Sequence, residues 1–184
     1  MRYLILFLIF SLTTGPLATP ARAQAAPSVA SDELTLKVSR SPLTKSEVDQ
    51  YLTALEKWGE YVKARPKEWQ AMLDQGDTAR LWSKIGIKGE DMSLLSAKIN
   101  LAAMLSDNAN YVAEMEKSFK LKEEALARST PQDRAAMRKR MDIEREFIRN
   151  LKKSAPESLK VYKAYKPKIE AANERLNRQI KPGG

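Results

Sequence analysis

The chain has 184 residues, with 32 Lys and Arg against 23 Asp and Glu, and it contains neither Cys nor His. The absence of Cys excludes disulfides, thiol nucleophiles and thiolate metal sites, and the absence of His excludes Ser-His-Asp catalysis and histidine metal sites. We therefore expect a non-enzymatic protein without a metal or a cofactor. A hydrolase that uses two carboxylates is the enzymatic alternative, because a sequence does not show a cleft.

The N-terminal residues have the three parts of a secretory signal in the right order. Arg2 supplies a positive charge, residues 4–12 are apolar, and Ala21-Arg22-Ala23 offers the small residues that a signal peptidase needs. The apolar run is far shorter than the ~20 residues that span a bilayer. We expect residues 1–23 to be a signal peptide that is cleaved near Ala23, and the remaining protein to be periplasmic or secreted.

Residues 24–43 are rich in Ala, Ser and Pro. Leu34, Leu36 and Val38 alternate as in a strand, but a single strand has no partner with which to pair. We expect a flexible or loosely docked segment over this range.

A capping box predicts the start of the first helix. In Thr44-Lys45-Ser46-Glu47, the Thr hydroxyl and the Glu carboxylate can each accept a hydrogen bond from a free amide of the first turn. Apolar residues then follow at helical spacing as far as Arg65. The segment Leu43–Glu47 also resembles the short Leu-Thr-x-x-Gln segments at helix starts of cradle-type periplasmic chaperones, with Glu in the last position.

The middle of the chain predicts one short helix, one helical turn and one long helix. Pro66 is suited to the first position of the short helix, which Gly76 ends. Asp77 can cap the turn that follows. Residues 90–128 are apolar around much of the helical circumference, which is typical of a helix covered by its neighbours. We expect this segment to be a long central helix.

Two prolines mark the predicted starts of two later helices. Ser129-Thr130-Pro131 predicts a fourth helix that ends near Lys153, and Ser154-Ala155-Pro156 predicts a fifth, with a kink or split at Pro167. Taken together, residues 44–181 predict an all-α fold. We expect one helical domain, a bundle of about five helices that are mainly antiparallel.

The excess of positive charge is confined to the last part of the chain. Residues 24–130 carry 15 basic and 16 acidic residues, whereas residues 131–184 carry 15 basic and seven acidic. Many of these cations recur at intervals of three, four or seven residues, which places them on one side of a helix. The predicted basic face comprises Arg134, Arg138, Arg145, Arg149, Lys152, Lys160, Lys163, Arg175 and Arg178.

This face predicts an electrostatic docking surface for an anionic protein partner or an unfolded client, in a role like that of an adaptor or chaperone. An anionic cell wall or lipid surface is an alternative partner, and a structural role at such a surface is a further alternative function. The alternative without a binding function is that these cations form an ordinary solvated helix face. Nucleic acid is not expected, because the chain carries an export signal and no recognition motif. The sequence does not predict an oligomeric state.

A second functional hypothesis comes from the aromatic residues of the first half. They could line a pocket for a small molecule, as in a carrier or sensor domain, although residues at helical spacing more often form a core. The candidates for this pocket are Tyr51, Trp58, Trp69 and Trp82.

Overall fold

The computed structural model describes residues 29–75, 77, 79–128 and 130–180, and all regular secondary structure in these residues is helical. The predicted all-α class is therefore confirmed. The predicted signal peptide lies outside the described residues. Seven helices, rather than about five, occur in the described part of the chain: α2 (Val29–Arg40), α3 (Lys45–Ala64), α4 (Pro66–Asp74), α5 (Ala79–Lys84), α6 (Gly89–Asp107), α7 (Tyr111–Ala127) and α8 (Pro131–Ile180).

The described chain forms two compact units. The hairpin unit contains residues 29–48 and 94–166. The aromatic unit contains residues 49–93 and 167–180. Each unit has its own set of buried apolar side chains, and each is described separately below.

In the hairpin unit, helix α2 covers residues 29–40 of the segment that we expected to be flexible or loosely docked. Val38 and Ser39 are buried, and the Ser39 carbonyl accepts a hydrogen bond from the Ser154 hydroxyl at 3.0 Å. An ion pair of 2.8 Å between Glu33 and Lys37, four residues apart, supports the helix on its exposed side. Contacts with α8 thus stabilise a segment whose composition suggested disorder.

The predicted capping box is present at the start of α3. The Thr44 amide donates to the Glu47 carboxylate at 2.8 Å, and the Glu47 amide donates to the Thr44 hydroxyl at 3.2 Å. The other carboxylate oxygen of Glu47 accepts a hydrogen bond of 2.6 Å from Lys98 on α6, whose side chain is only 4% exposed. Lys98 also donates to the Ser41 hydroxyl at 2.8 Å and to the Pro42 carbonyl at 3.3 Å. This buried ammonium therefore has all three of its hydrogens engaged.

The predicted long central helix over residues 90–128 is two helices, so that prediction was wrong. The break falls at Asn108-Ala109-Asn110, where the Asn108 side-chain oxygen accepts the Asn110 amide at 2.9 Å. The Asn108 side-chain amide donates to Glu114 on α7 at 2.9 Å. Asn favours such local hydrogen bonds over the helical ones, and the apolar pattern on both sides of the break hides this effect in the sequence.

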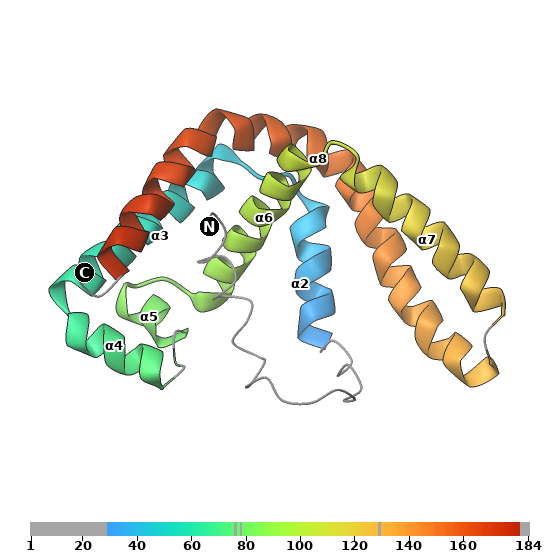
Figure 1. Ribbon diagram of the computed structural model, residues 1–184, viewed down its shortest axis with the longest axis horizontal. Coiled ribbons are helices and arrows are strands. Elements are labelled where there is room, and N and C mark those ends of the chain that lie inside the picture. Colours follow the sequence, from blue (N-terminus) through green and yellow to red (C-terminus); the bar gives the residue numbers. More distant parts are fainter. Residues whose placement is uncertain (1–28, 76, 78, 129, 181–184) are drawn as a thin grey trace. The chain divides into compact units, whose positions relative to one another are not determined.

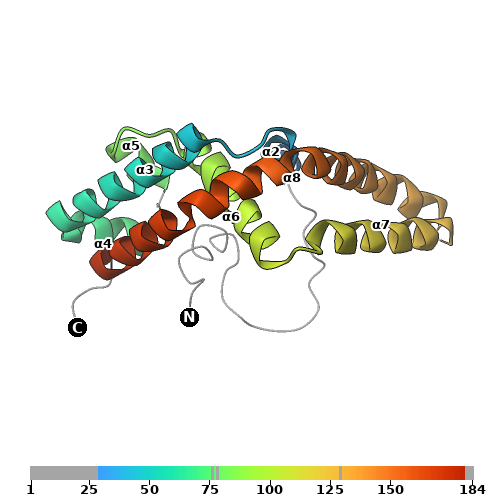
Figure 2. The same ribbon diagram turned by 90° about the horizontal axis from the view of Figure 1, so that it is seen from above.

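Helices α7 and α8 form an antiparallel hairpin, in which the two helices lie side by side in both views (Figure 1 and Figure 2). Ion pairs fix the register, because Glu123 pairs with Arg145 at 3.0 Å and Glu116 pairs with Lys152 at 2.5 Å. The hairpin core contains seven buried residues: Leu105, Phe119, Met141, Phe147, Ile148, Leu151 and Ala155.

Helix α8 is continuous over 50 residues, so the predicted end of one helix at Lys153 and start of another at Pro156 were wrong. A proline in a helix interior removes one backbone hydrogen bond and costs about 3 kcal/mol. Buried contacts on both sides of Pro156 offset this cost. Ser158, for example, accepts the Leu43 amide at 2.9 Å and donates to the Ser154 carbonyl at 2.9 Å. Pro167 likewise lies within α8 and does not split it.

The aromatic unit is organised around Trp58 on α3. The Trp58 ring makes edge contacts with Trp69 of α4 and Trp82 of α5, at centroid distances of 5.6 and 5.2 Å. Pro66 is at the start of α4, as predicted. Gly86 follows α5 with φ at +74°, a conformation that glycine adopts without strain. Edge-to-face contacts between three indoles supply much of the apolar burial of this small unit.

Candidate docking surface

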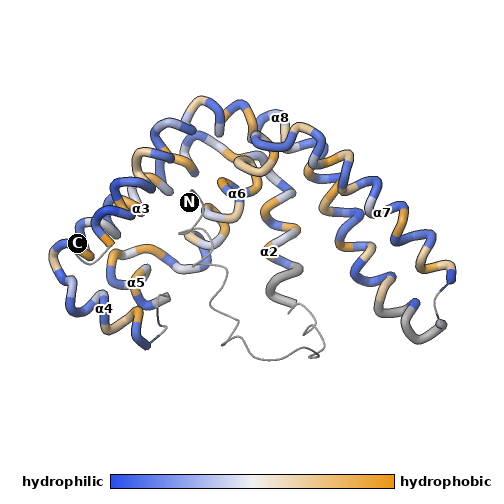
Figure 3. The backbone as a smooth tube through the Cα atoms, viewed as in Figure 1, coloured by the Kyte–Doolittle hydropathy of each residue, from blue (hydrophilic) through white to orange (hydrophobic). Residues whose placement is uncertain are grey.

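The predicted basic face is divided by the structure. Seven of its nine residues belong to the hairpin unit, whereas Arg175 and Arg178 belong to the aromatic unit. Of the predicted cations, a docking surface in the hairpin unit can therefore include only the seven of that unit. Figure 3 shows that hydrophilic residues predominate along α8.

Two of the predicted docking residues already serve as braces within the hairpin. The Arg145 guanidinium pairs with Asp142 at 2.9 Å and with Glu123 at 3.0 Å, and it lies 5.2 Å from the centre of the Phe119 ring. The Lys152 ammonium pairs with Glu116. Because these charges are compensated inside the chain, they contribute little to a field that an outside molecule would meet.

Four further cations of α8 form a continuous strip, which we call the α8 ridge: Arg149, Lys153, Lys160 and Lys163. All four side chains are exposed. At about 100° per residue they fall within a sector of about 80°, and at 1.5 Å per residue they extend over about 21 Å. The opposite side of the same stretch is buried, with Leu151, Ser154 and Ser158 packed into the unit. The ridge is thus the outward side of a helix whose inner side is fixed.

No ion pair or hydrogen bond joins any ridge side chain to the part of the chain that the structure describes. Between Arg149 and Lys163 the sequence contains one carboxylate, Glu157, which is exposed and pairs with neither Lys153 nor Lys160. Lys153 belongs to the ridge although the predicted face omitted it. The spacing of positive residues could have included it, since it lies four residues after Arg149.

The other predicted members lie apart from the ridge. Arg138 is exposed and unpaired among the described residues, but Asp142 and the braced Arg145 separate it from Arg149 along α8. Arg134 is half-buried and interacts within the chain. The structure therefore retains Arg149, Lys160 and Lys163 from the predicted set as one surface, and adds Lys153 to them.

The predicted aromatic pocket residues lie in the core of the aromatic unit. Trp58, Trp69 and Trp82 are 7, 4 and 8% exposed, and Tyr51 is equally buried. The Tyr51 hydroxyl donates to the Asn173 side chain of α8 at 3.4 Å. All four side chains are buried, and the Trp58 ring packs against those of Trp69 and Trp82, which favours a structural role over the lining of a ligand pocket.

No protein-family model, no curated protein and no solved structure matches this chain. Among the described residues, none of the helices combines the length and the apolar character that crossing a membrane requires.

Proposed function

We propose that this chain is an exported, non-enzymatic protein whose α8 ridge binds an acidic protein partner or an acidic unfolded client. The observation that supports the proposal is the set of four exposed cations on about four turns of one helix, none of them compensated within the described chain. Attraction by such a strip acts over roughly the Debye length, about 10 Å at 0.1 M salt, and accelerates encounter with an anionic surface.

A rigid helix makes the ridge suitable for docking. The buried inner side of α8 holds the backbone in place, with Leu151 only 1% exposed, so the cations keep their spacing when a partner arrives. Long Lys side chains with rotatable ammonium groups adapt to carboxylates in different arrangements. These properties favour a client or partner that is defined by its acidic character more than by one fixed shape.

The test is a quadruple charge reversal, Arg149→Glu, Lys153→Glu, Lys160→Glu and Lys163→Glu, in the full-length chain. The probes are a poly-glutamate peptide and a permanently unfolded acidic protein, with association rates measured over a salt series. We expect the variant to associate roughly tenfold more slowly, or worse, than the original protein at low salt. The difference should shrink as salt increases.

A matched control reverses four cations elsewhere. These are exposed residues of α3 and α4 with no ion pair among the described residues: Lys45, Lys57, Lys63 and Lys67. This control changes the net charge by the same amount. Equal loss of binding in both variants would show that net charge, not the ridge, attracts the probes. Ridge-dependent binding to anionic vesicles, with no binding to either acidic probe, would support the lipid-surface alternative instead.

A further inference from the structure

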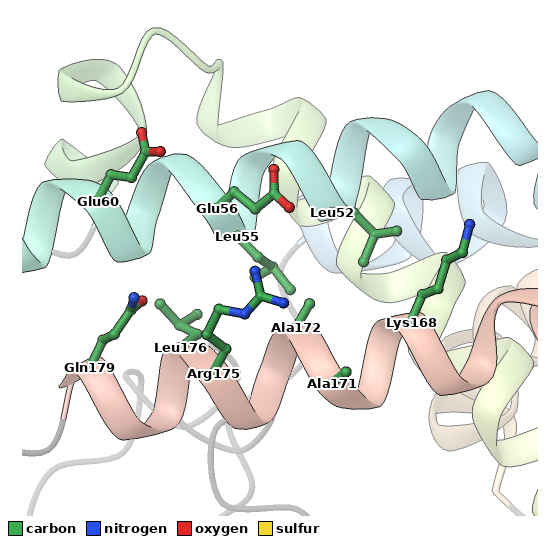
Figure 4. Close-up of a pocket in the computed structure, with 10 residues that line it drawn as sticks. All are labelled: Leu52, Leu55, Glu56, Glu60, Lys168, Ala171, Ala172, Arg175, Leu176 and Gln179. Carbon is green, nitrogen blue, oxygen red and sulfur yellow. The ribbon is translucent and has the colours of Figure 1, made fainter.

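A second surface feature lies in the aromatic unit, where α3 and the last part of α8 run parallel and border a groove of about 420 Å³ (Figure 4). The parallel direction follows from two contacts: Tyr51 meets Asn173, and further along both helices the Gln179 side chain fills the space beside Gly59. The absence of a side chain at Gly59 allows this close approach. The groove is lined by Leu52, Leu55, Glu56, Glu60, Lys168, Ala171, Ala172, Arg175, Leu176 and Gln179.

The two walls of the groove carry opposite charges. Glu56 and Glu60 are four residues apart on α3 and form a carboxylate wall, whereas Lys168 and Arg175 give α8 a cationic wall. In Figure 4, Glu56 and Arg175 lie at the same level along the two helices, on opposite sides of the groove. Leu55 and Leu176 are buried and form an apolar floor.

The charges of the walls are not all compensated within the chain. Neither Glu56 nor Glu60 forms an ion pair or hydrogen bond with any residue that the structure describes, and the same holds for Arg175. A partner that matches this groove offers cations to the carboxylate wall, a carboxylate to Arg175 and some apolar surface between them. A second copy of the same groove meets all three conditions.

We propose that this groove is the contact surface of a symmetric dimer, in which the carboxylate wall of each copy lies against the cationic wall of the other. The charges select one of two symmetric arrangements. A two-fold axis perpendicular to the helices would place α3 of one copy against α3 of the other, so that the carboxylates of the two copies would face and repel each other. An axis parallel to the helices places α3 over α8 and, because it keeps the level along the helices, brings Glu56 of one copy to Arg175 of its partner.

Charge-swap complementation tests this arrangement in the full-length chain. One variant carries Glu56→Lys and Glu60→Lys, and the other carries Lys168→Glu and Arg175→Glu. We expect the original protein to show a concentration-dependent dimer in sedimentation velocity, which salt weakens. In a homodimer of either variant, walls of like charge would face each other, so self-association of that variant should be about a hundredfold weaker than that of the original protein. An equimolar mixture restores opposite charges at both contacts and should form a heterodimer.

Two controls separate the groove from general charge effects. Glu170→Lys with Glu174→Lys reverses two exposed carboxylates at the same spacing on another side of α8, and it should leave the dimer unchanged. Lys57→Glu with Lys67→Glu matches the second variant in net charge. Circular dichroism checks that each variant remains helical.

Three results would overturn the dimer: an original protein that stays monomeric at every concentration, a dimer that survives either single-wall variant, or a mixture that stays monomeric. The dimer and the docking function can fail independently, because the groove and the α8 ridge share no residue. If the dimer is absent, the charge-reversal test of the α8 ridge remains valid, and the reverse also holds.

Discussion

The hairpin unit and the aromatic unit use charged side chains on α8 in different ways. In the hairpin unit, Arg145 and Lys152 connect α8 to α7, and the ridge that begins at Arg149 has no such partners among the described residues. In the aromatic unit, Arg175 faces a groove whose opposite wall is acidic. Neighbouring cations of α8 can therefore differ completely in how much positive charge they offer to an outside molecule. Arg145 pairs with a carboxylate of α7, whereas Arg149 pairs with none in the described part of the chain.

The units also differ in how they bury apolar surface. The hairpin unit uses mainly aliphatic residues, with Phe119 and Phe147 between them, whereas the aromatic unit also buries three indoles, and Trp58 contacts the other two. Loss of a ring that contacts two other rings should therefore destabilise the protein more than loss of one contact in a core that spreads its contacts along two helices.

The largest expected effect is therefore at Trp58. Trp58→Ala should lower the free energy of unfolding by about 4 kcal/mol, because it leaves a cavity between Trp69 and Trp82. Trp58→Phe should cost only about 1 kcal/mol, since the indole nitrogen has no hydrogen-bond partner among the described residues. Denaturation with urea measures both. An equally large loss for Trp58→Phe would mean that the indole nitrogen has a partner after all.

The next largest loss of stability is expected from breaking the ion pair between Lys98 and Glu47 in the hairpin unit. Lys98→Met leaves the Glu47 carboxylate without its main partner and should lower the free energy of unfolding by about 3 kcal/mol. Adding Glu47→Leu to that variant should recover part of the loss, because no unpaired charge then remains. If the double variant were as unstable as the sum of the two single ones, the ion pair would not be the source of the effect.

The same pair predicts a dependence of stability on pH. Partial burial raises the pKa of Glu47, but hydrogen bonds from Lys98 and Thr44 outweigh burial and hold this pKa below its ordinary value of 4.5. The group therefore contributes stability above pH 4.5, and the contribution is lost as the pH falls through the lowered pKa. Unfolding measured on both sides of pH 4.5 should show this loss, and Lys98→Met should reduce it. An unchanged acid dependence in Lys98→Met would exclude Glu47 as its source.

The smallest effects distinguish the braces from the ridge. Arg145→Ala removes two exposed ion pairs and a contact with the Phe119 ring, so it should cost about 1 kcal/mol. Arg149→Ala removes no ion pair or hydrogen bond with the described chain and should change stability by less than about 0.5 kcal/mol. Thermal unfolding of the two variants side by side checks the contrast. An equal cost at both positions would show that Arg149 also braces the fold.

The sequence predicted the features that local chemistry determines. The capping box at Thr44, the start of α4 at Pro66 and the helical class all follow from side chains that interact within a few residues. Features that depend on distant contacts were missed. Helix α2 is held by Ser154, 115 residues away, and α8 continues through Pro156 because its flanks are buried. The break at Asn108 was missed because polar residues also occur inside helices.

The candidate site shows the same limit. Helical spacing correctly places Arg145, Arg149 and Lys152 on one side of a helix, but spacing does not show which of them face α7. Only the register of the hairpin reveals that Glu123 and Glu116 compensate Arg145 and Lys152. The aromatic residues, in turn, have the same spacing whether they line a pocket or fill a core, and the packing of Trp58 decides between the two.

The central claim is that uncompensated cations on α8, and not the net charge of the chain, attract an acidic partner. Its most direct test is the salt dependence of association with the poly-glutamate peptide, for the original protein, the Arg149, Lys153, Lys160 and Lys163 reversal, and its matched control. We predict a steep dependence for the original protein and the control, and a nearly flat one for the ridge variant. The same steep dependence in all three proteins would contradict the account.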